Sequence, residues 1–358
     1  MPSWLAGLAF VDRSGIVADH AASWAHGHQT RRGQSHVAVE APSPQQSAVD
    51  AAWGIILAAR AMADDLERDG RVGRFAVDEE GDLHPLPAEH PDAVLAWCPG
   101  DGWQSRLPPE DARADFLNLY LPICSATSAR PMTVGHLGQS LDGFIATHTG
   151  DSRFVTGNDN IVHAHRMRAL CDAVIVGAGT VAADDPRLTT RHVPGPSPLR
   201  VVFDPGRRLA PTFRVFTDRI AQTLYCCGRS RIAPGETHVG GAAIAGIDTA
   251  LPGNGVAEML RLLHARGCSR VFVEGGGVTV SAFLEANLLD RLQIAVAPLL
   301  IGDGRPAIRL PAHARLRDCR RPVYRVFRMG GDVLFDCQLD APPGAVDPTT
   351  PGAVSRII

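Results

Sequence analysis

Two glycine-rich turns in the second half of the chain have the composition of phosphate-binding sites. Residues 271–279 read Val-Phe-Val-Glu-Gly-Gly-Gly-Val-Thr, and residues 174–180 read Val-Ile-Val-Gly-Ala-Gly-Thr. Glycine lets a backbone approach a phosphate closely, and a helix that follows offers free N–H groups and the positive end of its dipole. Neither turn is a complete G-x-G-x-x-G, so helix–strand packing explains each one equally well. Two such turns in one sheet favour a dinucleotide, because ligands collect at the carboxyl ends of parallel strands.

Charged residues near these turns are candidates for chemistry. Glu274 ends its strand, where a carboxylate either hydrogen-bonds or exchanges a proton with a substrate, or caps the following helix. Arg168 and Arg191 offer bidentate donors that clamp a phosphate, with a solvated surface position as the alternative. Asp142 and Asp184 stand beside turns, where aspartate is most often a turn former. Spacing alone leaves both interpretations of each residue open.

The cysteines and histidines do not predict a metal or redox centre. None of the eight cysteines forms a C-x-x-C or has a histidine at zinc-finger spacing, so the thiols are expected to be core residues. The adjacent pair Cys226 and Cys227 is expected to end a strand. Four histidines within residues 18–40 suggest a metal hypothesis, but no helical or hairpin register aligns them. A polar segment without a metal is therefore expected there.

The composition argues against several classes of protein. The chain has 358 residues, a formal net charge of −3, and no lysine among its 35 basic residues. A Walker-type phosphate loop, a pyridoxal Schiff base and the ATP site of a kinase all need the side-chain amine of a lysine, so these classes of protein are not expected. The charge balance argues against binding to nucleic acid or a membrane surface, and no apolar run approaches the ~20 residues of a membrane span. Without a signal-peptide pattern, the expected location is the cytoplasm.

Hydrophobic periodicity divides the chain near residue 130. Before it, a helix is predicted over residues 47–69, with strands at 74–77 and 93–97 and connectors at 107–109 and 121–129. After it, strands are predicted at 132–137, 173–176, 199–203, 222–226, 242–247, 271–274, 292–297 and 333–337, and helices at 158–170, 255–266 and 279–286. This alternation predicts an α/β fold with a mostly parallel central sheet and helices on both faces, preceded by a smaller α+β N-terminal region. The predicted domains are 1–129, of unknown role, and 130–340, with a loose proline-rich tail at 341–358.

Several motifs in a fixed order resemble one enzyme family. They are Gly-Gln-Ser-Leu-Asp-Gly at 138–143, Gly-Asp-Ser-Arg-Phe-Val-Thr-Gly at 150–157, His-Arg-Met-Arg-Ala at 165–169, the run 176–191, Val-Glu-Gly-Gly-Gly at 273–277 and Ala-Pro-Leu-Leu-Ile-Gly at 297–302. Their order resembles the pyrimidine reductase family of riboflavin biosynthesis, which includes the C-terminal domain of the bifunctional deaminase-reductase. The resemblance covers residues 130–338.

The resemblance implies a dihydrofolate-reductase-like fold and a defined reaction. The family reduces a 5-amino-6-(5-phosphoribosylamino)uracil-type ribosylaminopyrimidine phosphate, with NADPH delivering hydride to C1 of the ring-opened ribose. The implied NADPH site comprises Gly138, Phe154, Thr180, Asp184, Arg208, Gly276, Gly277, Val278, Thr279 and Val280. The implied substrate site comprises His136, Ser152, Arg168, Leu188, Arg191 and Glu274, with Glu274 as the catalytic residue and the arginines near the phosphate. Arg208 is implied to favour the 2′-phosphate of NADPH over NADH.

The chain departs from the family pattern at three places. His136 stands where lysine is usual, and an imidazole near the substrate would titrate around neutrality, unlike lysine. Phe154 stands where tryptophan is frequent. The zinc-deaminase motifs H-x-E and P-C-x-x-C do not occur before residue 130. Two alternatives stay open: a paralogue that reduces a different pteridine or imine, and a nucleotide-binding module without turnover. A homodimer is expected through an exposed C-terminal edge strand.

Overall fold

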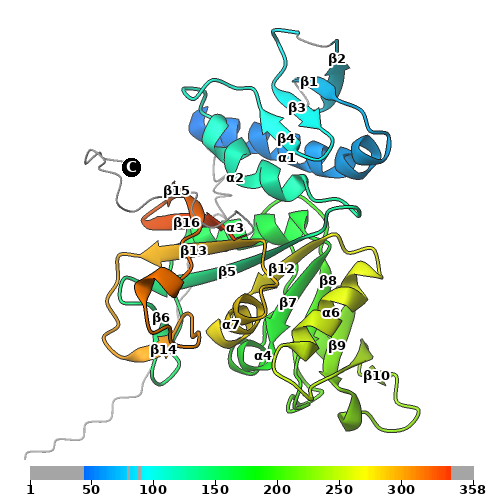
Figure 1. Ribbon diagram of the computed structural model, residues 1–358, viewed down its shortest axis with the longest axis vertical. Helices are drawn as coiled ribbons and strands as arrows, with labels where there is room; N and C mark the ends of the chain where they lie inside the picture. The colour runs from blue at the N-terminus through cyan, green and yellow to red at the C-terminus, as the bar shows by residue number, and fades with distance from the viewer. Residues whose placement is uncertain (1–43, 79–80, 88–89, 340–358) are drawn as a thin grey trace, which may run out of the picture. The chain divides into compact units, whose positions relative to one another are not determined.

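The computed structural model describes residues 44–78, 81–87 and 90–339, which lie in one compact unit beginning at Pro42 (Figure 1). The histidine-rich segment within residues 18–40 and the tail at 341–358 lie outside the described residues. The division at residue 130 stays a prediction, and the described residues on its two sides pack together. Within the described ranges, no helix is both long enough and apolar enough to cross a membrane.

The described N-terminal segment folds as a small layer of helices and antiparallel strands, which we call the N-terminal layer (residues 44–124). Its elements are α1 (Pro44–Arg68), β1 (Gly73–Val77), β2 (Leu83–Leu86), β3 (Leu95–Cys98), β4 (Gly102–Ser105) and α2 (Ala114–Cys124). The strand order is β2-β1-β3-β4. Trp103 lies edge-on to both Phe75 and Trp97, with ring centroids 5.2 Å apart in each pair. Large buried rings thus give this short sheet its core.

The connector predicted over residues 121–129 is wrong for its first four residues. Helix α2 continues to Cys124 and carries Pro122 in its last turn. Leu121, Ile123 and Cys124 are all buried. A proline near a helix end removes little of the backbone ladder, so the burial of its apolar neighbours outweighs its effect.

The remaining chain builds a ten-stranded sheet in the order β10-β11-β9-β8-β7-β12-β5-β13-β16-β15. Its strands are β5 (Met132–Ser140), β7 (Ala173–Gly177), β8 (Leu199–Phe203), β9 (Thr223–Gly228), β10 (His238–Val239), β11 (Ala242–Ile247), β12 (Arg270–Glu274), β13 (Arg291–Ala297), β15 (Val323–Met329) and β16 (Asp332–Gln338). All neighbours from β11 to β13 run parallel, and β10, β16 and β15 pair antiparallel. The predicted mostly parallel sheet is confirmed. A separate pair is formed by β6 (Phe144–Thr147) and β14 (Gly304–Pro306).

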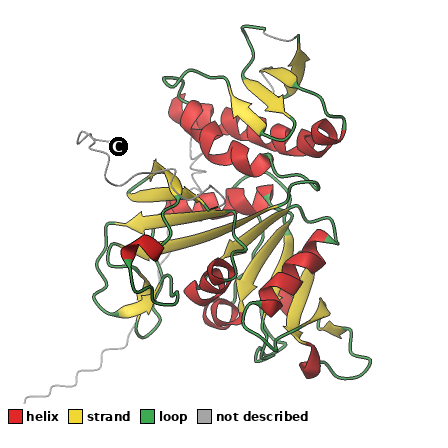
Figure 2. Cartoon of the chain, viewed as in Figure 1, coloured by secondary structure: helices red, strands yellow, loops and turns green. Residues whose placement is uncertain are grey.

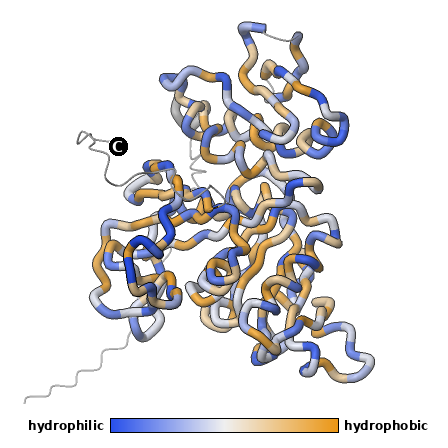
Figure 3. The backbone as a smooth tube through the Cα atoms, in the orientation of Figure 1, coloured by the Kyte–Doolittle hydropathy of each residue, from blue (hydrophilic) through white to orange (hydrophobic). Residues whose placement is uncertain are grey.

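Helices cover both faces of this sheet, as expected (Figure 2). They are α3 (Asn158–Leu170), α4 (Ala178–Asp184), α5 (Arg214–Thr217), α6 (Asn254–His264) and α7 (Gly277–Glu285). Alternate strand residues divide between two cores: Val174 and Val176 pack with α3, α4 and α5, whereas Ala173 and Ile175 pack with α6 and α7. The central strands are accordingly apolar along their length (Figure 3).

The cysteines are free thiols, and most of them are core residues. All eight lie in the described ranges without a disulfide, and six are buried. Cys226 and Cys227 lie within β9 and enter opposite cores, as successive strand residues must. Burial raises the pKa of Cys226 to about 12.

Candidate active site

A cavity of about 1230 Å³ opens where the parallel strands end. Its wall receives residues from the ends of three neighbouring strands, namely Gly138 of β5, Gly177 of β7 and Glu274 of β12. In open α/β sheets, ligands bind in the crevice outside the carboxyl ends of the strands. A volume above the usual range for a single drug-sized ligand leaves room for a dinucleotide and a second molecule.

The two glycine-rich turns meet at this cavity. The backbone N–H of Gly276 donates to Thr180 Oγ1 at 3.1 Å, which joins the start of α7 to that of α4. Gly275 has a φ of +94°, and a Cβ on Gly277 would lie 2.1 Å from the carbonyl oxygen of Ala307. Glycine is therefore required at both positions by backbone geometry and close packing. Gly179 faces open space, so its turn leaves the α4 N-terminus accessible.

Glu274 is held by Arg168 of α3. The guanidinium donates through Nε to Oε2 at 2.7 Å, and its Nη2 donates to Oε1. Arg168 is 10% exposed and Glu274 17% exposed in their side chains. Burial alone would lower the pKa of Arg168, but the Glu274 carboxylate outweighs it and holds that pKa above its usual value. Two of the N–H groups of Arg168 therefore orient the Glu274 carboxylate. The sequence predicted only a phosphate contact for this residue.

Positive charge dominates the wall of the cavity. Its described lining includes five arginines, Arg168, Arg191, Arg208, Arg305 and Arg309, against the two carboxylates of Asp184 and Glu274. Burial raises the pKa of Asp184, although Arg305 acts in the opposite direction. Such a wall is complementary to a ligand with several phosphates.

The loop that carries Arg208 is fixed by a buried aspartate. Asp204 Oδ2 accepts hydrogen bonds from the backbone N–H groups of Arg208 (2.6 Å) and Leu209 (3.0 Å) and from the hydroxyl of Tyr225 (2.8 Å). The Arg208 side chain itself is 77% exposed. Its Nε lies 3.8 Å from Asp204 Oδ1, so most of the guanidinium is exposed at the rim, where it suits the capture of a phosphate.

His136 lies deep in the wall and is neutral. It is the Cα partner of Glu274 in the β5–β12 pairing, and it is 4% exposed. Burial lowers its pKa to about 4, although Glu274 acts in the opposite direction. The expectation that His136 titrates around neutrality is therefore wrong, because burial disfavours the imidazolium. Neither ring nitrogen has a hydrogen-bond partner within the described part of the chain.

Most of the expected site residues do line this cavity. Thirteen of them are brought together there: His136, Gly138, Ser152, Arg168, Thr180, Asp184, Arg191, Arg208, Glu274, Gly276, Gly277, Val278 and Thr279. Three are not among the described lining residues. Leu188 and Val280 are buried in the cores, and Phe154 is 77% exposed in a left-handed conformation with φ 60°. The structure therefore does not place Phe154, Leu188 or Val280 at the site.

One face of α3 contributes residues that sequence reasoning missed. Asn160, Ala164 and His165 line the cavity together with Arg168. Their spacing of four, one and three residues is the repeat of one helix face, which was the available signal. His165 Nδ1 accepts the backbone N–H of Arg191 at 2.9 Å, and so links α3 to the loop of Arg191. Arg305 and Arg309, also missed, follow no recognisable pattern.

Buried neutral histidines predict that the protein loses stability in mild acid. Burial lowers the pKa of His136 to about 4 and, with Arg168 and Arg191, that of His165 to about 3, against an ordinary value of 6.5. Below pH 6.5 the unfolded chain takes up protons that the folded protein does not, so stability falls with pH by up to ~1.4 kcal/mol per unit for each such histidine until the folded pKa is reached. Urea unfolding between pH 4.5 and 7 measures this slope. The slope should be smaller in His136→Gln; an equal slope in both proteins would contradict the expectation.

Comparison with known proteins agrees with this geometry. Residues 132–321 match the model of the RibD C-terminal domain. The chain is 33% identical over 221 residues to the 2,5-diamino-6-ribosylamino-4(3H)-pyrimidinone 5′-phosphate reductase of Methanothermobacter thermautotrophicus, covering 58% of this chain and 97% of that protein. It is 31% identical over 179 residues to riboflavin biosynthesis protein RibD of Aquifex aeolicus, covering 50% of this chain and 49% of that protein. This chain therefore spans about half the length of that RibD.

A solved structure shows the same fold. Acinetobacter baumannii RibD superimposes with a TM-score of 0.51 at 20% identity, over 80% of this chain and 99% of that one. The family match covers more than half of the chain, and it includes every described residue that lines the strand-end cavity, from His136 to Arg309. From residue 132 to residue 321, this chain belongs to the RibD C-terminal domain family.

Proposed function

We propose that this protein is an NADPH-dependent reductase of a ribosylaminopyrimidine 5′-phosphate in riboflavin biosynthesis. The observation that carries the proposal is the carboxylate of Glu274, fixed by Arg168 beside two glycine-rich helix starts in one positively charged cavity. The related proteins named as pyrimidinone phosphate reductase and RibD support the choice of substrate class.

The residues at the glycine turns fit a pyridine dinucleotide. The N-termini of α4 and α7 face the cavity at Ala178 and Gly277, and their first N–H groups are free of intrahelical partners. Thr180, Gly276 and Thr279 would surround the diphosphate. Gly138 lets the side chains of Thr156 and Asn160 pack directly against β5, where a Cβ would lie 2.8 Å from Thr156 Cγ2. When bound, NADPH supplies the hydride; the protein's part is alignment and charge.

Arg208 is the proposed contact for the 2′-phosphate of the cofactor. Its guanidinium is exposed at the rim while Asp204 holds its backbone. A bidentate contact with a phosphate would favour NADPH over NADH by charge as well as by geometry.

The substrate is proposed to lie beside the Arg168–Glu274 pair, with Arg191 close to it on the cavity wall. Arg191 and Arg168 would receive its 5′-phosphate, with Ser152 and His136 beside the sugar. In the ring-opened ribosylamine, C1 is an imine carbon. Protonation of the imine nitrogen makes C1 more electrophilic. The Glu274 carboxylate would accept the N–H of that protonated imine and stabilise its positive charge until the hydride neutralises it. Reduction converts the imine into the ribitylamine.

A homodimer is proposed through β15, the last strand at the edge of the central sheet. Tyr324 and Arg328 of this strand are exposed and most of its other residues are half-buried. An edge strand is a place where a second copy could pair through its backbone. Size-exclusion chromatography with light scattering measures the mass.

Turnover with authentic substrates tests the proposed function. We expect purified protein to oxidise NADPH with either the diaminopyrimidinone or the aminouracil ribosylamino 5′-phosphate, and NADH at least about tenfold less efficiently, as expected for loss of one charged phosphate contact. Tight NADPH binding with no turnover of either compound would overturn the assignment of substrate. Turnover of a pteridine instead would indicate a paralogous reductase, and no turnover of any of these a nucleotide-binding module.

A further inference from the structure

His136 is supported from behind by a second buried imidazole. His163 of α3 lies edge-to-face against it, with ring centroids 5.0 Å apart. His163 is fully buried and is not among the described residues that line the cavity. The His136 ring, which forms part of the cavity wall, thus packs against the His163 ring, which does not line the cavity.

A directional chain of hydrogen bonds fixes His163. Its Nε2 lies 2.9 Å from Gln293 Oε1, and Gln293 Nε2 donates to Asp336 Oδ1 at 3.3 Å. Burial disfavours the Asp336 carboxylate, but Arg291 and Arg325 outweigh it and hold its pKa below the ordinary value. An ionised carboxylate only accepts, so Gln293 must present its amide N–H₂ to Asp336 and its oxygen to His163.

The chain of hydrogen bonds continues from His163 to Tyr120 in the N-terminal layer. Because Gln293 accepts, His163 Nε2 carries the proton, and in a neutral imidazole Nδ1 is then an acceptor. Burial lowers the pKa of His163 well below its ordinary value, so the ring is neutral. The hydroxyl of Tyr120, on α2, lies 2.8 Å from Nδ1 and therefore donates to it. Tyr120 closes a chain that begins at Asp336.

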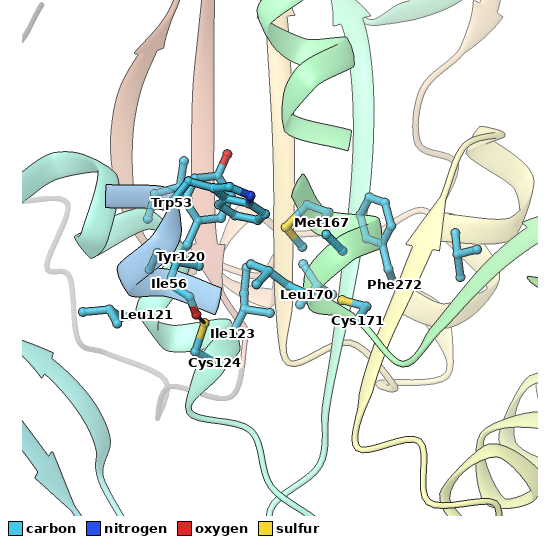
Figure 4. Close-up of a cluster of buried hydrophobic side chains, with 14 of the residues drawn as sticks. Trp53, Ile56, Tyr120, Leu121, Ile123, Cys124, Met167, Leu170, Cys171 and Phe272 are labelled. Atoms are coloured by element: carbon cyan, nitrogen blue, oxygen red, sulfur yellow. Dashed lines mark hydrogen bonds between the residues drawn. The ribbon is translucent and has the colours of Figure 1, made fainter. Parts of the chain in front are cut away.

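The N-terminal layer also contacts α3 at Arg166 and at Leu170. The guanidinium of Arg166 lies 4.7 Å from the ring centroid of Phe116 and 5.9 Å from that of Trp53. Arg60 of α1 donates to the carbonyl oxygen of Leu170, the last residue of α3, at 2.8 Å. Figure 4 shows Trp53 and Ile56 of α1 and Tyr120 of α2 gathered with Met167 and Leu170 of α3 in one buried cluster.

We infer that the N-terminal layer supports the cavity by holding α3 in place, and that Tyr120 is a positioning residue. Through His163, Tyr120 fixes the orientation of the His136 ring. Helix α3 carries the argument, because Asn160, His165 and Arg168 form cavity wall while His163 and Arg166 meet the layer. The layer therefore holds the helix that presents Arg168, and with it Glu274, to the ligand. What His136 then contacts rests on the proposed function; how its ring is held does not.

Tyr120→Phe in the full chain tests this inference, because it removes only the hydroxyl. With ¹⁵N-labelled histidine, we expect the ring signals of His163 and His136 both to shift, since Nδ1 of His163 loses its donor. We expect the KM for the pyrimidine phosphate to rise about fivefold and that for NADPH to change less than about twofold, the scale of one lost hydrogen bond.

Phe75→Leu provides a matched control, since Phe75 is buried in the same layer but belongs to the ring cluster of Trp103. It should lower thermal stability without moving the histidine signals or the substrate KM. Unchanged His136 signals in Tyr120→Phe, or the same shifts in Phe75→Leu, would overturn the inference. If the wild-type protein turns over no pyrimidine phosphate, the proposed function fails, and the histidine signals still decide this inference.

Discussion

Replacement of Glu274 by glutamine is expected to lower kcat with the pyrimidine phosphate by about 10²–10⁴-fold, while the dissociation constant of NADPH changes less than about twofold. The carboxylate ends β12 at the cavity wall and receives two N–H groups from Arg168. Glutamine keeps one acceptor oxygen but carries no negative charge, so it does not stabilise a protonated imine. Steady-state kinetics and titration of NADPH fluorescence measure the two constants separately.

Glu258→Gln is a suitable control for this variant. Glu258 also pairs with an arginine, Arg229, and its side chain is 18% exposed, but it is not among the described residues of the cavity. Its replacement should leave kcat unchanged. A large loss of NADPH affinity in Glu274→Gln, with kcat preserved, would assign Glu274 to the cofactor site instead.

Residues at strand ends were the predictable part of the site. Glu274 and the glycines that follow it could be placed because an apolar run, a glycine turn and a helix succeed one another directly along the chain. Parallel strands bring such turns to one edge, so Thr180 and Gly276 meet although 96 residues separate them. The local sequence was therefore sufficient to place those site residues that lie at the end of a strand or in the turn that follows it.

Partners of these residues were not predictable, because they depend on how α3 packs. Arg168 lies 106 residues from Glu274, and no local pattern distinguishes an arginine that holds a carboxylate from one that meets a phosphate. The neutral state of His136 depends on burial beneath His163 and Tyr120, which belong to two other elements. Phe154 and Leu188 were carried over from motif positions, but each adopts positive φ here and neither is among the described residues that line the cavity.

The fold shows the same division. Strands buried on both faces, such as β7 and β8, are short continuous apolar runs and could be located to within a residue. Strand β15 reads Val-Tyr-Arg-Val-Phe-Arg-Met, and it was missed because a mixed polar edge strand lacks such a run. Helix α4 was taken only as a glycine turn, since its seven residues are too few for a periodic signal.

The pair formed by Arg168 and Glu274 is expected to separate stability from catalysis. Arg168→Met leaves a mostly buried carboxylate without its cation, which should lower the free energy of unfolding by about 3–5 kcal/mol. Removing both charges in Arg168→Met/Glu274→Leu should recover most of that loss. Two apolar side chains of similar size can pack against each other, whereas a single buried charge is left without a partner. Urea unfolding at pH 7 measures both variants against the wild type.

Activity should not follow stability in this series. The double variant has neither the carboxylate at the end of β12 nor the guanidinium that orients it, so it should fold and yet lack turnover. Recovery of both would mean that the pair is only a packing device and that the protonated imine is stabilised elsewhere. If the double variant is as unstable as Arg168→Met, the contacts of Arg168 with His165 and the Thr189 carbonyl oxygen, rather than its charge balance with Glu274, hold this side of α3 in place.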